Sequence, residues 1–175
     1  MSKHSGFFHC QALLAVVIAG SVLMPLQAQT TPSALEMVEQ LKTQPPRTRS
    51  LRNLTIESSA PEAKPSLSLL IQFDFNSAKV KPESQQALSN LAQALQSREL
   101  VEAKFAVEGH TDAKGRADYN LKLSQQRADA VRAYLASNGV QDSRLAAVGK
   151  GATELANSAD PQGAENRRVR IVNLN

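Results

Sequence analysis

The sequence predicts an α+β fold, a two-layer α/β sandwich in which helices pack on a mixed β-sheet. Segments in which apolar and polar residues alternate, as they do in half-buried strands, recur along residues 66–175. Two segments with apolar residues at helical spacing separate the first three of these strands. Helices that connect strands favour parallel pairs, and a last strand that follows closely without a helix favours a mixed sheet. We therefore expect the order β-α-β-α-β-β.

Each element has its own signal. Pro82 begins the first helix of this unit, because its fixed φ suits the first helical position, and Gly139 ends the second. The expected strands are residues 67–75, 103–108, 145–148 and 168–171. The apolar face of the first helix holds Leu88, Leu91 and Leu95, and that of the second holds Ala128, Val131 and Leu135.

The N-terminal third divides into two further regions. Residues 1–28 are predicted to be a cleavable export signal, with Lys3 before an apolar core and the small residue Ala28 at the cleavage point. The apolar core is short for a membrane span, although an uncleaved anchor is the alternative. Residues 29–65 are expected to form a short amphipathic helix and a linker, with Ser33 as the helix cap. Leu35, Val38 and Leu41 form the predicted stripe of that helix, which docks on its own domain or on a partner.

Composition excludes several classes of protein. The net charge of +4 is modest and spread along the chain, and aromatic residues make up 4%, so we do not expect nucleic-acid binding. The single cysteine, Cys10, precedes the apolar core, whereas a lipid-bearing cysteine would follow it. Once the signal is removed, no thiol chemistry or disulfide remains. We predict no cofactor and no metal site.

The most informative stretch joins the second strand to the second helix. Gly109 and Gly115 are expected to turn the chain, since glycine tolerates positive φ. Ser124 is the predicted N-cap of the helix, which would place Arg127 in the first turn, where the helix dipole favours an anion. Asp112 and Arg127 would then bracket a group that carries both an ammonium and a carboxylate. A structural salt bridge between them is the alternative.

The motifs of this region resemble a known family. Gly109-His110-Thr111-Asp112, Asn120-x-x-Leu123-Ser124-x-x-Arg127-Ala128 and Asn166-Arg167-Arg168-Val169 are similar to the OmpA C-terminal-like peptidoglycan-binding domain, the family that includes Pal and the periplasmic part of MotB. The resemblance runs from about Leu67 to Leu174. It implies an OmpA-like domain over residues 66–175 that binds the diaminopimelate of the peptidoglycan stem peptide.

The resemblance also assigns roles to single residues. Asp112 would take the ligand ammonium, and Arg127 would take a ligand carboxylate through a bidentate, charge-assisted contact. The backbone of Thr111 and Asp112, with Asn120, would hold another carboxylate. The expected pocket walls are Phe75, Asn76, Leu123 and Arg168. From the residues alone, Asn76 and Ser77 equally fit turn caps, and the Asn-Arg-Arg motif equally fits an exposed strand start.

Two other functions are weighed against this one. His110 is the only histidine after the signal, and Asp112 and Ser124 lie near it in sequence, so a cell-wall hydrolase is an alternative. The chain has no Gly-x-Ser-x-Gly elbow, and one histidine cannot build a histidine-rich metal site. A second alternative is an adaptor that recruits an envelope protein through the N-terminal helix. We expect a non-catalytic protein of the periplasm or outer membrane that tethers an envelope component to the cell wall.

Overall fold

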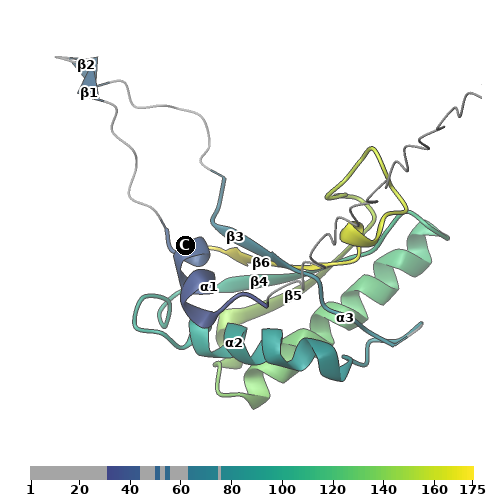
Figure 1. The fold of residues 1–175 in the computed structure, drawn as a ribbon, viewed down its shortest axis with the longest axis horizontal. Coiled ribbons are helices and arrows are strands. Elements are labelled where there is room, and N and C mark those ends of the chain that lie inside the picture. The colour runs from purple at the N-terminus through teal and green to yellow at the C-terminus, as the bar shows by residue number, and fades with distance from the viewer. Residues whose placement is uncertain (1–30, 44–49, 52–53, 56–62, 75) are drawn as a thin grey trace, which may run out of the picture.

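The computed structural model describes residues 31–43, 50–51, 54–55, 63–74 and 76–175 (Figure 1). The predicted export signal and Phe75 lie outside the described residues, and the proposed boundaries between the three regions remain predictions. Two short strands, β1 (Ser50–Leu51) and β2 (Leu54–Thr55), pair antiparallel in the N-terminal third. Within the described ranges no helix combines the length and apolar character needed to cross a membrane.

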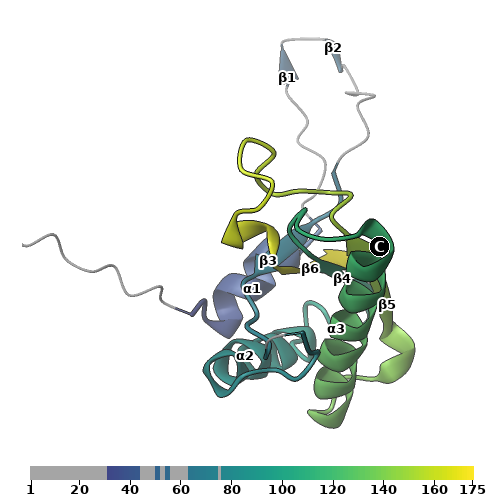
Figure 2. The ribbon, with the colours of Figure 1, turned by 90° about the vertical axis from the view of Figure 1, so that its right-hand side faces the viewer.

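The main sheet has four strands in the order β3-β6-β4-β5. They are β3 (Ser66–Leu69), β4 (Phe105–His110), β5 (Leu145–Gly151) and β6 (Val169–Asn173). β4 and β5 are parallel, while β6 runs antiparallel to both β3 and β4. Helices α2 (Gln85–Leu95) and α3 (Ala117–Ser137) lie on the same side of the sheet (Figures 1 and 2). The predicted mixed α+β fold is therefore confirmed.

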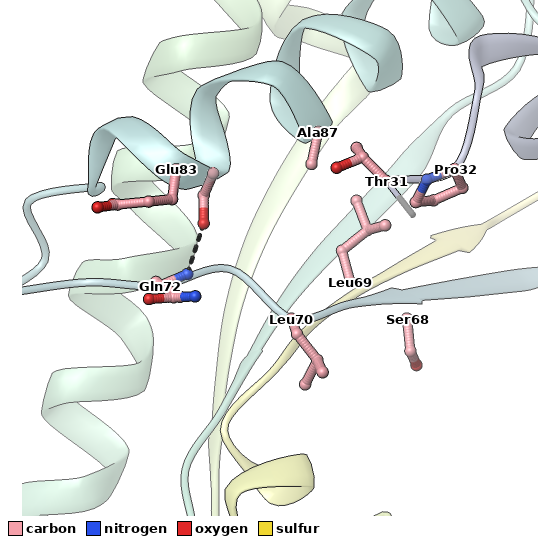
Figure 3. Close-up of a pocket in the computed structure, with 9 residues that line it drawn as sticks. Thr31, Pro32, Ser68, Leu69, Leu70, Gln72, Glu83 and Ala87 are labelled. Atoms are coloured by element: carbon pink, nitrogen blue, oxygen red, sulfur yellow. Dashed lines mark hydrogen bonds between the residues drawn. The ribbon is translucent and has the colours of Figure 1, made fainter. Parts of the chain in front are cut away.

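The first strand of the sheet is much shorter than the alternating pattern predicted. Beyond Leu69 the chain leaves β6, and the backbone N–H of Gln72 donates to the Ser84 hydroxyl at 2.8 Å (Figure 3). Ser84 belongs to the 3-10 helix η1 (Pro82–Ser84) that precedes α2. Because the backbone of Gln72 bonds to this helix, the prediction of a strand up to residue 75 is wrong. Leu70, the first residue after this short strand, is 52% exposed.

The N-terminal helix α1 (Ala34–Leu41) begins at the predicted cap. Ser33 and Glu36 form a capping box, which satisfies two backbone donors at the helix start. The helix packs on its own domain: Met37, Val38 and Leu41 belong to the core, and Asn173 Nδ2 donates to the carbonyl of Leu41 at 2.9 Å. The predicted stripe was wrong in one position, since Leu35 is 79% exposed and Met37 takes its place.

Helix α3 begins earlier than predicted and touches the sheet at two glycines. Its N-cap position is Arg116, so Ser124 is not a cap, and Arg127 lies in the middle of the helix, away from the N-terminal dipole. The Ser124 hydroxyl instead accepts from the Gly151 backbone N–H at 2.9 Å. Gly109 is not a turn residue but part of β4, and a Cβ there would lie 2.1 Å from the Ser124 carbonyl oxygen. Glycine thus allows α3 to contact the sheet backbone directly.

Two further 3-10 helices complete the unit, η2 (Asp142–Arg144) and η3 (Ala164–Asn166). Gly139 follows α3 with φ of +94°, as its predicted role at the helix end requires. Arg144 is buried at η2 and donates to the carbonyl oxygens of Leu95, Leu100 and Ala103. It therefore ties the end of α2 and the following loop to the start of β5.

Candidate ligand-binding site

Arg127 projects from the middle of α3 and is half-buried. Its Nε donates to the Ser77 carbonyl at 3.2 Å, and its guanidinium lies 4.8 Å from the centroid of the Phe73 ring. Burial lowers the pKa of Arg127, and the positive charge of Arg167 acts in the same direction. Among the described residues, no carboxylate forms a salt bridge with Arg127. The side chain is thus held in place by neutral groups, and its charge is available to an anion.

Asp112 follows β4 and already has a cationic partner. Its Oδ2 accepts from Arg167 Nη1 at 2.7 Å, and its Oδ1 accepts from the Lys114 backbone N–H at 3.1 Å. Sequence reasoning did not single out Arg167 and chose its neighbour Arg168 instead. The two arginines have different partners, since Arg167 Nη1 donates to Asp112 whereas Arg168 Nη2 donates to the Glu154 carbonyl.

The loop that carries Asp112 is fixed from several sides. Asn120, buried in the first turn of α3, donates through Nδ2 to the carbonyls of Asp112 and Lys114 at 3.3 and 3.0 Å. The Thr111 backbone N–H donates to the Gly151 carbonyl at 2.8 Å. Two of the predicted site residues therefore build the frame of the Asp112 loop: Asn120 through its side chain and Thr111 through its backbone.

An open pocket of about 410 Å³ lies beside these groups. Its lining residues are Leu70, Ile71, Gln72, Phe73, Arg127, Ala164 and Arg167. Two guanidiniums line it and no carboxylate does, so the pocket is suited to an anionic group. Asp112 is not part of this lining, but its carboxylate pairs with Arg167, which is.

A second pocket, of about 290 Å³, lies beside the same segment (Figure 3). It shares Leu70 and Gln72 with the first, and its remaining lining residues are Thr31, Pro32, Ser68, Leu69, Glu83, Ser84 and Ala87. The only charged side chain in this lining is that of Glu83. Because its only charge is negative, the second pocket is less suited to a carboxylate than the arginine-lined pocket, which is the candidate site.

The other predicted wall residues are distributed around this site. Leu123 is half-buried four residues before Arg127, which places it on the same face of α3. Asn76 has a positive φ of 52° and precedes Ser77, so it forms a turn next to the carbonyl that binds Arg127. Arg168 is not in the lining of the pocket, because its Nη2 donates to the Glu154 carbonyl at 3.1 Å.

Arg168 belongs instead to a charged cluster around His110. His110 is 2% exposed, and its Nε2 lies 3.7 Å from Glu108 Oε2. Burial lowers the pKa of His110 to about 4, and the nearby cations Arg168, Arg170 and Lys150 contribute to this shift. His110 is therefore neutral at pH 7.

This environment offers no hydrolytic triad. In the described part of the structure neither ring nitrogen of His110 has a hydrogen-bond partner, and the Ser124 hydroxyl donates to the Leu121 carbonyl within its own helix. A nucleophile and its base need to be within hydrogen-bond reach of each other. The same described ranges contain no group of three His, Cys, Asp or Glu side chains arranged to hold a metal ion.

Comparisons with known proteins agree with this fold. The model of the OmpA family matches residues 72–169, which is more than half of the chain. Outer membrane protein A of Bordetella avium is 43% identical over 101 residues, which cover 57% of this chain and 51% of that protein. The chain thus spans about half the length of this curated relative.

Two solved structures are similar in both fold and sequence. The peptidoglycan-associated lipoprotein from Burkholderia pseudomallei is 35% identical with a TM-score of 0.51, and the match covers 61% of this chain and 88% of that one. The cell wall anchor of the T6SS from Pseudomonas aeruginosa is 33% identical with a TM-score of 0.51, and the match covers 61% and 78%. Together with the family model, these similarities show that the chain belongs to the OmpA family.

Proposed function

We propose that this protein binds peptidoglycan non-covalently and without catalysis, and so tethers an envelope component to the cell wall. The observation that carries the proposal is the pocket lined by Arg127 and Arg167, in which Arg167 is paired with the Asp112 carboxylate. Relatives that are named as a peptidoglycan-associated lipoprotein and a cell wall anchor support it. Relatives named as outer membrane proteins and as a lipoprotein support a location in the periplasm or at the outer membrane.

The ligand group in this proposal is the diaminopimelate of the stem peptide. Its free end carries an ammonium and a carboxylate on one carbon. Arg127 binds the carboxylate, because a planar guanidinium matches a carboxylate with two parallel hydrogen bonds. The contacts with Ser77 and Phe73 hold Arg127 before the ligand arrives, which reduces the entropy lost on binding.

Asp112 provides the opposite charge in the same proposal. Its carboxylate is largely buried and fixed by the Lys114 backbone N–H, so an ammonium brought to it forms a charge-assisted hydrogen bond in a partly desolvated place. Leu123 and Asn76 flank the ligand, and Thr111 and Asn120 keep the loop in position.

A second candidate function, an envelope adaptor, is favoured by one feature of α1. The helix buries Met37, Val38 and Leu41 in its own domain and leaves Leu35 on the outside. A protein partner would therefore have to contact the face around Leu35. If the protein is such an adaptor, Leu35→Asp should abolish capture of the partner and leave binding to sacculi intact. This result would separate the adaptor function from wall binding.

The test of the main proposal is a pull-down with purified sacculi. We expect the unaltered protein to sediment with diaminopimelate-type sacculi, and Asp112→Asn or Arg127→Gln to lose at least tenfold in affinity, because each leaves a partly buried ligand charge without a partner. Arg116→Gln is the matched control, since it also removes one positive charge, and among the described residues Arg116 pairs only with Asp118 on the surface. Binding that survives both site substitutions would refute the proposal.

A further inference from the structure

In the free protein, the place that the ligand ammonium needs is taken by Arg167. Its Nη1 lies 2.7 Å from Asp112 Oδ2, and the two residues are 55 positions apart in the chain. The Arg167 side chain is 48% exposed, whereas that of Asp112 is 13% exposed. Asp112 is thus the fixed member of the pair and Arg167 the accessible one.

The position of Arg167 does not look like that of a residue needed for folding. In the described structure, Asp112 is the only partner of the Arg167 side chain, and Arg167 is part of the lining of the pocket. Arg144 is the contrasting case, since it is buried and donates to three backbone carbonyls. Arg167 is therefore free to move without loss of a backbone contact.

The ion pair restricts which ligands can reach Asp112. A ligand that offers only an ammonium, such as a lysine side chain, would have to displace Arg167 and leave two guanidiniums facing one pocket without an anion. A ligand that also brings a carboxylate supplies that anion. Before binding, Asp112 pairs with Arg167; after binding, Asp112 pairs with the ligand ammonium and the ligand carboxylate pairs with the arginines. No partly buried charge is then left without a partner.

We propose that Arg167 is the specificity-determining residue of this site: it yields Asp112 to the ligand ammonium and, with Arg127, binds the ligand carboxylate. This inference rests on the proposed function and deepens it. The preference for a zwitterionic end group then comes from an exchange of partners at Asp112, in which the ligand ammonium replaces Arg167. Ligands that carry an amine alone are disfavoured, because they leave Arg167 without an anion. The selectivity follows from the repulsion between Arg127 and Arg167 when no carboxylate lies between them.

The test compares three synthetic stem tripeptides by calorimetric titration of the purified protein. They end in meso-diaminopimelate, in its side-chain carboxamide, and in lysine, so that the second keeps the size and the amine of the first but lacks the negative charge. We expect the unaltered protein to prefer the diaminopimelate peptide by at least roughly tenfold over the other two.

Arg167→Gln is expected to weaken binding of the diaminopimelate peptide while the other two bind equally well or more tightly. The preference should therefore fall by roughly tenfold. Arg167→Lys, which keeps the charge without the planar fork, should retain an intermediate preference. The control Arg116→Gln should leave the preference unchanged, and circular dichroism checks that each variant is folded.

Two outcomes would overturn the inference. Either Arg167→Gln weakens all three peptides by the same factor, which would make Arg167 a general charge contribution, or the preference persists unchanged. If the unaltered protein binds none of the three peptides, the proposed function itself fails. The two failures are thus distinguishable.

Discussion

Protonation of the buried His110 should make the stability of this fold depend on pH. The folded pKa is about 4 against a usual value of 6.5, because the ring is buried and three cations lie near it. A histidine with a lowered folded pKa binds its proton better in the unfolded chain. Its contribution to stability is therefore complete above about pH 6.5 and is lost as the pH falls towards 4.

The size of the effect follows from the shift. Between 6.5 and about 4, at roughly 1.36 kcal/mol per unit, the free energy of unfolding should fall by up to about 3 kcal/mol. Five charged residues surround the ring: Glu108, Lys150, Glu154, Arg168 and Arg170. The pKa of about 4 already includes the opposing effect of Glu154. Glu108 lies 3.7 Å from Nε2, close enough to pair with a protonated ring, so about 3 kcal/mol is an upper value.

The assay is urea unfolding followed by far-ultraviolet circular dichroism, since the chain has no tryptophan. Midpoints are measured from pH 7 to pH 4 for the unaltered protein and for His110→Gln, which fills much of the same space and cannot take up a proton. The carboxylates whose pKa is lowered, such as Glu36 and Asp118, also lose stabilisation on acidification, but they do so in both proteins. A pH dependence that is the same in both proteins would refute the assignment to His110.

Two further predictions concern the scaffold that positions the site. Gly109→Ala should lower the free energy of unfolding by roughly 2–4 kcal/mol, because the new Cβ would meet the Ser124 carbonyl at 2.1 Å and push α3 off the sheet. Gly115 lies in open space at a φ of +92°, so Gly115→Ala should destabilise the protein only through backbone strain. Urea unfolding of the two variants measures both effects, and equal losses of stability would contradict the close contact between Gly109 and α3. Arg144→Met should destabilise by roughly 3 kcal/mol, since three buried carbonyls lose their donor. Thermal unfolding measures this loss, with Arg132→Met as the control, because the Arg132 guanidinium pairs with Asp142 on the surface. If Arg144→Met lost no more stability than Arg132→Met, the proposed tie between α2 and β5 would be contradicted.

Much of the fold could be predicted because its signals are local. Alternation located β4, β5 and β6 within a few residues, Ser33 capped α1, and Gly139 ended α3. The order of strands and helices restricted the topology to a mixed sheet, because connections between neighbouring elements follow simple rules. The family motifs also directed attention to Asp112, which pairs with Arg167, and to Arg127, which lines the same pocket as Arg167.

The errors occurred where a local signal competed with packing. Ser124 has the chemistry of a cap, yet it is buried in mid-helix and bonds to Gly151, 27 residues away. Leu35 has helical spacing with Val38, but Met37 is the residue that faces the core. The alternation up to Phe73 looks like a long strand, while the Gln72 N–H bonds to Ser84 instead of to β6. In each case the structure was determined by contacts that the pattern of neighbouring residues does not contain.

By itself, the sequence determined the fold class and the element order, because periodicity and motif spacing act over a few residues. It also pointed to Asp112 and Arg127 as candidates for the site. Only the tertiary structure decided that Arg167, and not Arg168, faces Asp112, and that Arg127 stands in mid-helix without an acidic partner among the described residues. The physical reason is that an ion pair between residues 55 positions apart depends on how η3 and the β4 loop pack together. No pattern within either segment contains that information.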